Sequence, residues 1–229
     1  MHQLARAVSL PKVPQQNRYD KRVLSLSPLL YYRLGESGGM SMRDSSGNGY
    51  HGLYTGATLN AGLGSGGQRA VYFDGLNDYA TMPASIDNVF PANEGTVCLW
   101  AKLDDPDDFD YFFAYRDGSF EFYVHRTAIT RIDSNGVKTI SVSTNDANDT
   151  SEYHIAVTWS VSNNRMRRYK NGVLTHAIAN LASYTVTPPA TLRIVGAASE
   201  TPTHVMRGWM HDVVLFSREL TPAEITKLL

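Results

Sequence analysis

The chain has 229 residues, which is enough for one well-cored β domain. Its 21 basic and 22 acidic side chains give a formal net charge of -1. A balance of this kind predicts no nucleic-acid partner and no charged membrane-binding surface. No run of about 18 apolar residues occurs, so membrane insertion is not expected either. The single cysteine, Cys98, excludes an intrachain disulfide.

Residues 1–26 contain Pro11, Pro14, a polar QQN run and scattered basic side chains, but no sustained apolar period. Such a segment cannot bury a core of its own. We predict an extended N-terminal anchoring arm over residues 1–26 and one domain over residues 27–229. A disordered tail and a segment that orders against a neighbouring protein both remain open. The arm lacks the continuous apolar segment of a secretory signal, so the chain is expected to be made without a signal peptide.

Residues 44–52 read DSSGNGYHG, a polar loop in which glycines allow the backbone to turn repeatedly. The side-chain oxygens of Asp44 and Asn48, together with main-chain carbonyls, are the hard ligands that calcium prefers. The spacing is not that of an EF-hand. An ordered polar loop without an ion is the alternative.

From Ser27 onward, short β-branched and aromatic runs alternate with clusters of Gly, Asn and Asp, as is typical of antiparallel sheets. In residues 153–160 the side chains alternate, so Tyr153, Ile155, Val157 and Trp159 should point into a core. Three dipeptides predict tight hairpin turns: Asp117-Gly118, Asn135-Gly136 and Asn171-Gly172. The strands are expected at residues 29–34, 70–75, 78–83, 95–103, 111–116, 119–126, 153–160, 165–178, 191–197 and 208–220.

The C-terminus carries the one clear helix signal. Thr221 as N-cap, Pro222 at the first helical position and Glu224 three residues after the cap form a capping box. The fold class is therefore predicted to be all-β, a two-sheet antiparallel sandwich with one short C-terminal helix and the extended N-terminal arm.

Three sequence patterns suggest catalysis or ion binding but lack the context that these functions need. Residues 35–39 satisfy GxSxG without the strand-to-helix turn of a nucleophile elbow, and residues 62–67 satisfy GxGxxG ahead of a strand rather than a helix. The acidic run at residues 104–110 is more typical of a solvated loop than of a second calcium site. Glycosidases need two carboxylates, and within the strand expected at residues 119–126 Glu121 has no acidic partner. We therefore predict that the chain is not an enzyme.

Seven segments follow one another along the chain: LLYYRLGE, DSSGNGYHG, YFDGLNDYATMP, TVCLWAKL, YHIAVTWS, RYKNGVL and HDVVLFSRELTPAEI. Their succession resembles the laminin G-like and concanavalin A-like lectin-glucanase jelly-roll superfamily, in particular its bacterial and phage branch. The resemblance covers roughly residues 28–229 and implies a jelly-roll sandwich. It also implies a structural calcium ion (Ca2+) held by Asp44, Asn48 and Asp212. Many relatives have two consecutive acidic residues where this chain has His211 and Asp212.

The resemblance implies recognition of a glycan or a cell-surface polysaccharide. Aromatic rings can stack on the apolar face of a pyranose, so the candidate ligand-binding residues are Tyr111, Tyr115, Arg116 and Tyr123. The arm also resembles the N-terminal anchors of bacteriophage structural proteins. It predicts a recognition module on a virion surface (a decoration, fibre or baseplate adhesin) or in another extracellular assembly. Residues 1–26 would contact other structural subunits, and a homo-oligomer is possible.

Two alternatives to this recognition module stay open. One is a purely structural virion protein that cements its neighbours without a ligand. The other is a polysaccharide-cleaving glycosidase that depends on Glu121.

Overall fold

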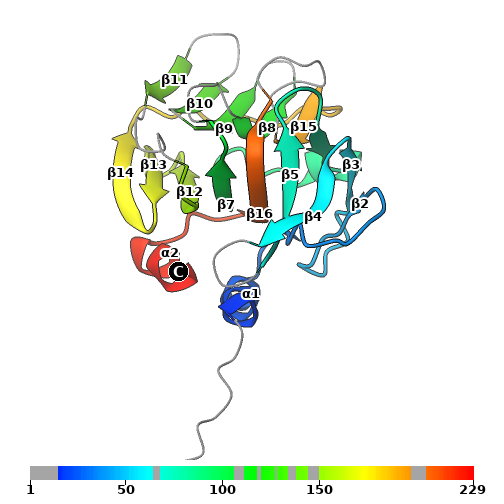
Figure 1. Ribbon diagram of the computed structural model, residues 1–229. Coiled ribbons are helices and arrows are strands. Elements are labelled where there is room, and N and C mark those ends of the chain that lie inside the picture. The colour runs from blue at the N-terminus through cyan, green and yellow to red at the C-terminus, as the bar shows by residue number, and fades with distance from the viewer. Residues whose placement is uncertain are drawn as a thin grey trace, which may run out of the picture.

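The computed structural model describes residues 15–63, 68–105, 111–117, 120–126, 128–133, 138–143, 150–196 and 205–229. Within these ranges the chain folds as two stacked antiparallel sheets, each with eight strands, which we call sheet A and sheet B (Figure 1). The predicted all-β jelly-roll sandwich is confirmed. None of the described helices is long and apolar enough to cross a membrane.

Sheet A has β16 near its centre, because the closing strand pairs with β7, β5 and β1. The strand β1 (Leu30–Tyr32) lies beside β16 outside the main path of the sheet. In spatial order the other strands are β14 (Val173–Ile178), β13 (Arg165–Lys170), β12 (Tyr153–Ser160), β7 (Glu94–Leu103), β16 (Arg207–Phe216), β5 (Arg69–Asp74) and β4 (Thr58–Leu63).

Sheet B packs against the other side of the core. Its strands β8 and β9 form a hairpin in which Ala114 lies opposite Tyr123 and Arg116 lies opposite Glu121. In spatial order the strands are β11 (Lys138–Ser143), β10 (Ala128–Asp133), β9 (Glu121–His125), β8 (Tyr111–Arg116), β15 (Leu192–Val195), β6 (Tyr79–Thr81), β3 (Gly52–Thr55) and β2 (Ser41–Met42).

The main core lies between the two sheets. Tyr153, Ile155, Val157 and Trp159 of β12 all belong to it, which confirms the predicted alternation. The intervening residues of β12 are buried as well, because the outer face of sheet A is itself covered.

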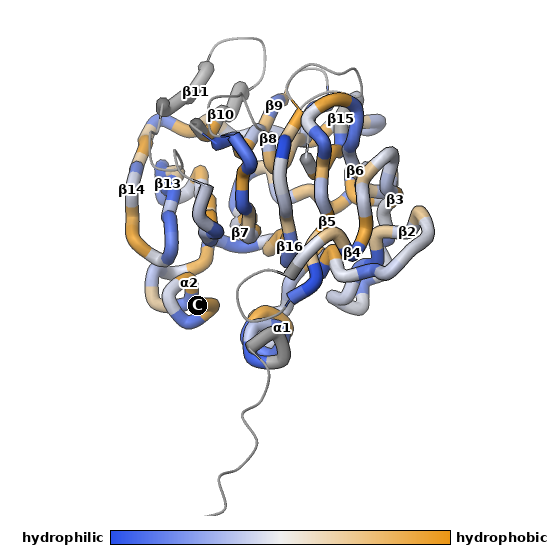
Figure 2. The backbone as a smooth tube through the Cα atoms, viewed as in Figure 1, coloured by the Kyte–Doolittle hydropathy of each residue, from blue (hydrophilic) through white to orange (hydrophobic). Residues whose placement is uncertain are grey.

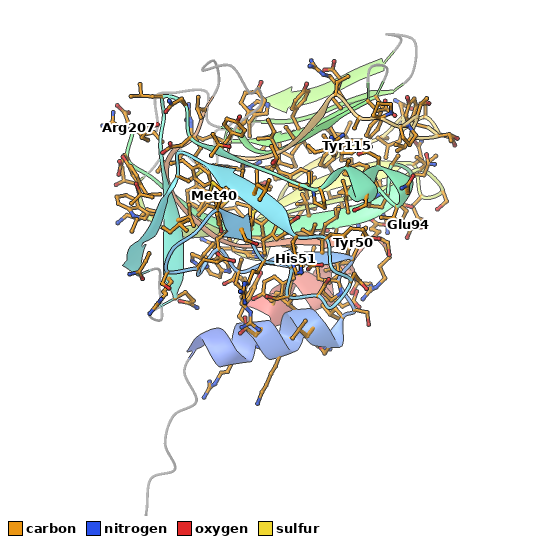
Figure 3. All side chains as sticks on the ribbon, turned by 90° about the vertical axis from the view of Figure 1, so that its right-hand side faces the viewer. Met40, Tyr50, His51, Glu94, Tyr115 and Arg207 are labelled. Atoms are coloured by element: carbon orange, nitrogen blue, oxygen red, sulfur yellow. The ribbon has the colours of Figure 1, made fainter. Side chains whose placement is uncertain are left out.

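Two helices cover that outer face: α1 (Gln15–Ser25) and α2 (Pro222–Leu228). They lie next to each other at the bottom of Figure 1, and Figure 3 shows α1 beneath the stacked sheets. Tyr19 and Val23 of α1 and Ile225 and Leu228 of α2 pack on Cys98 and its neighbours in a second apolar cluster. Burial raises the pKa of the Cys98 thiol well above its usual range.

The predicted extended conformation of the arm is wrong for residues 15–25, which form α1. Tyr19 and Val23 are one helical turn apart and are 4% and 0% exposed, while Lys21 faces solvent. In Figure 2 the hydrophobic side of α1 faces the sheets. Residues 1–14 lie outside the described residues, so their role as an anchor stays a prediction.

The structure contains the helix cap and the hairpin turn at Asn171 that the sequence predicts. Thr221 accepts a hydrogen bond from the Glu224 amide, and the Glu224 carboxylate accepts one from the Thr221 amide, which confirms the capping box. Asn171 and Gly172 have φ values of 50° and 78° between β13 and β14, as a tight hairpin turn requires. The predicted turn at Asn135 and Gly136, and Gly118 of the first turn, lie outside the described residues. A short 3-10 helix, η1 (Ala84–Asn88), completes the fold.

Candidate functional site

The loop of residues 44–52 is organised by the carboxylate of Asp44. Its Oδ1 accepts hydrogen bonds from the amides of Tyr31 and Ser46, both at 2.9 Å. Its Oδ2 accepts from the Ser46 hydroxyl at 2.8 Å and from the Tyr50 amide at 3.0 Å. A carboxylate has about four lone-pair sites. The hydrogen bonds to Asp44 therefore occupy the lone pairs with which it would bind a cation. Tyr50 and His51 of this loop are labelled in Figure 3.

The other two predicted calcium ligands point to different partners. The side-chain amide of Asn48 donates to the carbonyls of Pro28 and Leu29, at 3.2 and 2.9 Å. Asp212 interacts with the phenol of Tyr31, at the opposite end of that residue from the amide that binds Asp44.

Tyr31 therefore separates Asp44 from Asp212. Across the described ranges, no group of three or more His, Cys, Asp or Glu side chains could hold a metal ion. The predicted ligands do not surround one point, and the site as folded does not fit calcium.

Chelation should consequently leave the fold unaffected. We expect the melting temperature to be the same with and without EGTA, because hydrogen bonds to Asp44 already order the loop. Differential scanning calorimetry, together with metal analysis of the purified protein, measures this. A clear fall in melting temperature with EGTA, reversed by added calcium, would restore the ion predicted from the resemblance.

Asp212 belongs instead to a buried chain of polar groups that joins α1 to sheet A. The Tyr31 hydroxyl oxygen lies 2.5 Å from a carboxylate oxygen of both Asp20 and Asp212. His211 continues the chain, with Nδ1 2.9 Å from Asp212 and Nε2 3.0 Å from Glu152. Asp212 adopts φ 53° at the point where β16 changes its register against β7. Because of this irregularity, the consecutive side chains of His211 and Asp212 both belong to the buried row of polar groups.

The protonation states of these polar groups depend on their burial and on their hydrogen bonds. Burial alone would lower the pKa of His211, but its hydrogen bonds to Asp212 and Glu152 outweigh that effect and raise the pKa to about 9. Burial raises the pKa of Asp20, against the opposing effects of Tyr31 and Arg33. A hydroxyl has one proton, so Tyr31 can donate to one carboxylate at a time.

Three of the four predicted ligand-binding residues meet on the outer face of sheet B. The half-buried rings of Tyr111 and Tyr123 form an edge-to-face pair with centroids 5.6 Å apart. Arg116 is directly opposite Glu121 in the strand pairing, and its Nε donates to Thr191 at 3.2 Å. We call Tyr111, Arg116, Glu121 and Tyr123 the sheet B patch.

The charged members of the sheet B patch interact with Tyr123. Burial raises the pKa of Tyr123 to about 12, and the neighbouring Glu121 carboxylate adds to the rise through its charge and a hydrogen bond, while Arg116 opposes it. The patch therefore combines aromatic surface with a cation and an anion.

Tyr115, the fourth predicted ligand-binding residue, is not in this patch. It is fully buried in the core between the sheets and stacks on Phe90 at 3.6 Å (Figure 3). A change of register between Tyr111 and Phe113 interrupts the alternation of β8. As a result, Tyr111 and Tyr115 lie on opposite faces although they are four residues apart.

The sequence indicates Glu121 only as a possible catalytic acid, and it does not indicate that His125 stacks on Tyr111, at 4.7 Å. The signal that could have found them is the register of the β8–β9 hairpin. In the predicted acidic loop, Asp104 accepts from the Tyr72 hydroxyl at 2.8 Å, and residues 106–110 lie outside the described ranges. Of the GxGxxG pattern, residues 64–67 also lie outside them.

A family model for the concanavalin A-like lectin/glucanases superfamily matches residues 73–226. The chain belongs to this superfamily. That membership agrees with the resemblance of the sequence segments, although it does not extend to a phage origin. No curated protein was found to match the sequence.

Solved structures of the superfamily fold resemble the chain at low identity. Domain 4 of AbnA, a GH43 extracellular arabinanase from Geobacillus stearothermophilus solved with arabinotriose, has 18% identity and a TM-score of 0.65. The match covers 88% of this chain and 98% of that domain. A Trypanosoma rangeli sialidase mutant displaying trans-sialidase activity has 14% identity and a TM-score of 0.62, over 92% of this chain. The chain spans 36% of the length of that sialidase.

These likenesses show the fold, and they correct one prediction. The expectation that the chain is not an enzyme is contradicted, because a sialidase and an arabinanase are among the proteins with this fold. That expectation rested on the absence of a paired-carboxylate motif within one strand. Residues from different strands can meet on one sheet face, as Arg116 and Glu121 do here.

Proposed function

We propose that the chain is a carbohydrate-recognition domain and that the sheet B patch binds the sugar. The observation that carries this proposal is the pair of half-buried tyrosines, Tyr111 and Tyr123, on a sheet face beside Arg116 and Glu121. An aromatic ring covers the apolar face of a pyranose, while charged groups at its edge bind hydroxyls. The arabinotriose complex of the arabinanase domain supports a carbohydrate ligand.

A glycan array tests this function with the intact chain. The wild-type protein should bind a restricted set of glycans, and Tyr123→Ala should weaken that binding about tenfold or more, because central tyrosines often dominate a binding site. Tyr72→Ala is the matched control, since Tyr72 is also half-buried but lies on sheet A against Trp209. An array without signal, or equal losses in the two variants, would contradict the proposal.

The same sheet face carries a second candidate function, cleavage of the bound glycan. Glu121 contributes a carboxylate next to Tyr123, although a glycosidase needs a second acid as well. Incubating the array ligands with protein and measuring released reducing ends separates the two functions. Release that Glu121→Gln abolishes would assign cleavage; binding without release would leave recognition alone.

The setting of this domain stays a prediction. A virion surface or another extracellular assembly, contacts of residues 1–26 with other subunits, and a homo-oligomer are all consistent with a recognition domain. They rest on the resemblance of the sequence.

A further inference from the structure

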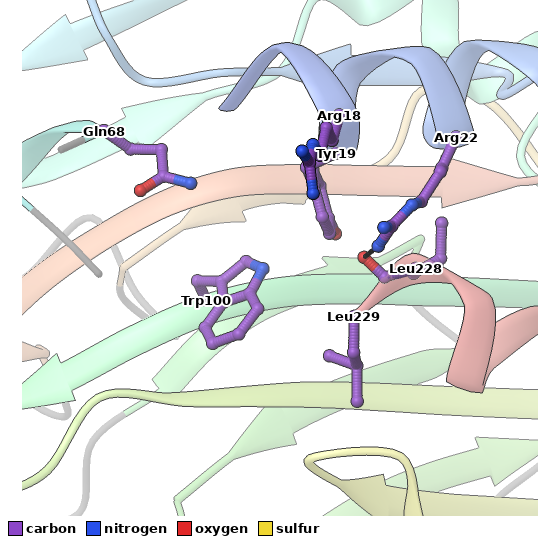
Figure 4. A pocket seen from close by; sticks show the side chains of 7 residues that line it. All are labelled: Arg18, Tyr19, Arg22, Gln68, Trp100, Leu228 and Leu229. Atoms are coloured by element: carbon purple, nitrogen blue, oxygen red, sulfur yellow. Dashed lines mark hydrogen bonds between the residues drawn. The ribbon is translucent and has the colours of Figure 1, made fainter. Parts of the chain in front are cut away.

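A cavity lies on the opposite side of the molecule from the sheet B patch, where α1 and α2 cover sheet A (Figure 4). Its cavity volume is about 170 Å³. Trp100 of β7 and Tyr19 of α1 form aromatic walls, and Leu228 and Leu229 close one side with apolar surface. An engineered protein cavity of about 150 Å³ holds benzene, so this hollow has room for one six-membered ring.

Two basic side chains line the cavity. Arg18 and Arg22 are one turn apart on α1, and both line the cavity. Arg22 donates to the carbonyl of Leu228 at 3.4 Å. Within the described part of the chain, neither guanidinium has an ion-pair partner. Paired guanidinium groups bind carboxylates through several parallel hydrogen bonds, so an anion suits this position.

Gln68 supplies the second, independent feature. Its side chain is 5% exposed, and its Oε1 accepts no hydrogen bond from the described residues. Figure 4 shows the amide of Gln68 at the edge of the cavity, with its nitrogen on the side of Tyr19. Buried acceptors in proteins are nearly always paired. We therefore expect Oε1 of Gln68 to accept a hydrogen bond from a molecule in the cavity.

We propose that this cavity binds a pyranose that carries a carboxylate, either free or at the end of a glycan. The carboxylate would bind Arg18 and Arg22, a ring hydroxyl would donate to Oε1 of Gln68, and the apolar face of the ring would contact Trp100. A neutral sugar leaves the guanidinium groups without an anion. A small carboxylate without hydroxyls leaves Gln68 without a donor.

This cavity is separate from the sheet B patch, because it lies on the outer face of the other sheet. The proposal therefore does not depend on the proposed function. Tyr123→Ala should leave binding in the cavity unchanged, so failure at one site can be told from failure at the other.

The test uses D-glucuronate as the probe, with glucose and acetate as comparisons. The chain has three tryptophans, Trp100, Trp159 and Trp209, so a nitrogen-15 correlation spectrum gives three indole signals. The signal that is missing in Trp100→Phe is that of Trp100. Glucuronate should shift the Trp100 signal in a saturable way, and added salt should weaken binding because exposed charges are screened.

Two variants and a matched control complete the experiment. Arg18→Gln and Gln68→Leu should each weaken glucuronate binding about tenfold, as loss of a charge-assisted or buried hydrogen bond does. Lys21→Gln removes the same charge from the exposed side of α1 and should leave binding unchanged. Gln68→Leu should not lower the melting temperature of the free protein, because the lost oxygen has no partner.

Three results would overturn the proposal. The first is a Trp100 signal that does not respond to glucuronate. The second is an equal response to acetate or glucose, which would mean that the cavity does not select an acidic sugar. The third is an equal loss of binding in Lys21→Gln and Arg18→Gln.

Discussion

Replacing Tyr31 by Phe is expected to lower the free energy of unfolding by about 3 kcal/mol, the usual cost of breaking a buried charged network. The hydroxyl oxygen of Tyr31 lies 2.5 Å from carboxylate oxygens of both Asp20 and Asp212. Without it, the buried carboxylates of Asp20 and Asp212 would lose the hydrogen-bond partner that they share. Since Asp20 is on α1 and Asp212 on β16, the loss should also loosen α1 from sheet A. Urea denaturation measures the change.

Tyr32→Phe is the matched control. Tyr32 is equally buried, but its hydroxyl donates to a single neutral group, the carbonyl of Tyr50, at 2.6 Å. Loss of such a bond costs about 1 kcal/mol. Equal losses in the two variants would show that the chain of acids from α1 to β16 contributes nothing beyond an ordinary hydrogen bond.

The second large effect is a loss of stability in acid that depends on His154. Burial, aided by the nearby charge of His211, lowers the pKa of His154 from 6.5 to about 3. The folded protein therefore keeps this ring neutral, whereas the unfolded chain takes up a proton as the pH falls below 6.5. The stability from this group is fully present above pH 6.5 and is lost toward pH 3. By pH 5 the loss should be about 2 kcal/mol.

His154→Phe isolates this contribution, because the variant keeps an aromatic ring beside Trp100 and Tyr19 but cannot titrate. Unfolding free energies of both proteins at pH 7 and pH 5 give a difference in which the titrating carboxylates cancel. The wild type should lose about 2 kcal/mol more than the variant over this range. A difference that does not change with pH would show that His154 does not titrate abnormally.

Local chemistry made most of the fold predictable. The strands are short β-branched and aromatic runs separated by turn residues, and their alternation placed Trp159 and its neighbours in the core. The capping box at Thr221 and the positive-φ pair at Asn171 and Gly172 depend on adjacent residues alone, so the sequence suffices to find them.

Features that depend on distant contacts were not predictable. The helix α1 has a polar sequence with few apolar positions, and it is held by contacts to residues far along the chain, such as Tyr19 with Trp100 and His154. A register change in β8 moved Tyr115 into the core. The alternation of residues cannot reveal such a shift.

The arrangement of the expected calcium ligands was unpredictable for a related reason. The resemblance identifies Asp44 and Asp212, but only the structure shows that Tyr31 lies between them and binds both. Arg116, Glu121 and Tyr123 lie in one patch because β8 pairs with β9, and the sequence alone does not show this pairing.

The most direct test of carbohydrate recognition is a crystal structure of the chain with an oligosaccharide that binds it on the array. We expect a sugar ring against Tyr111 or Tyr123, with a hydroxyl bound to Arg116 or Glu121. A ligand on Tyr72 and Trp209 of sheet A, with the sheet B patch left empty, would contradict it.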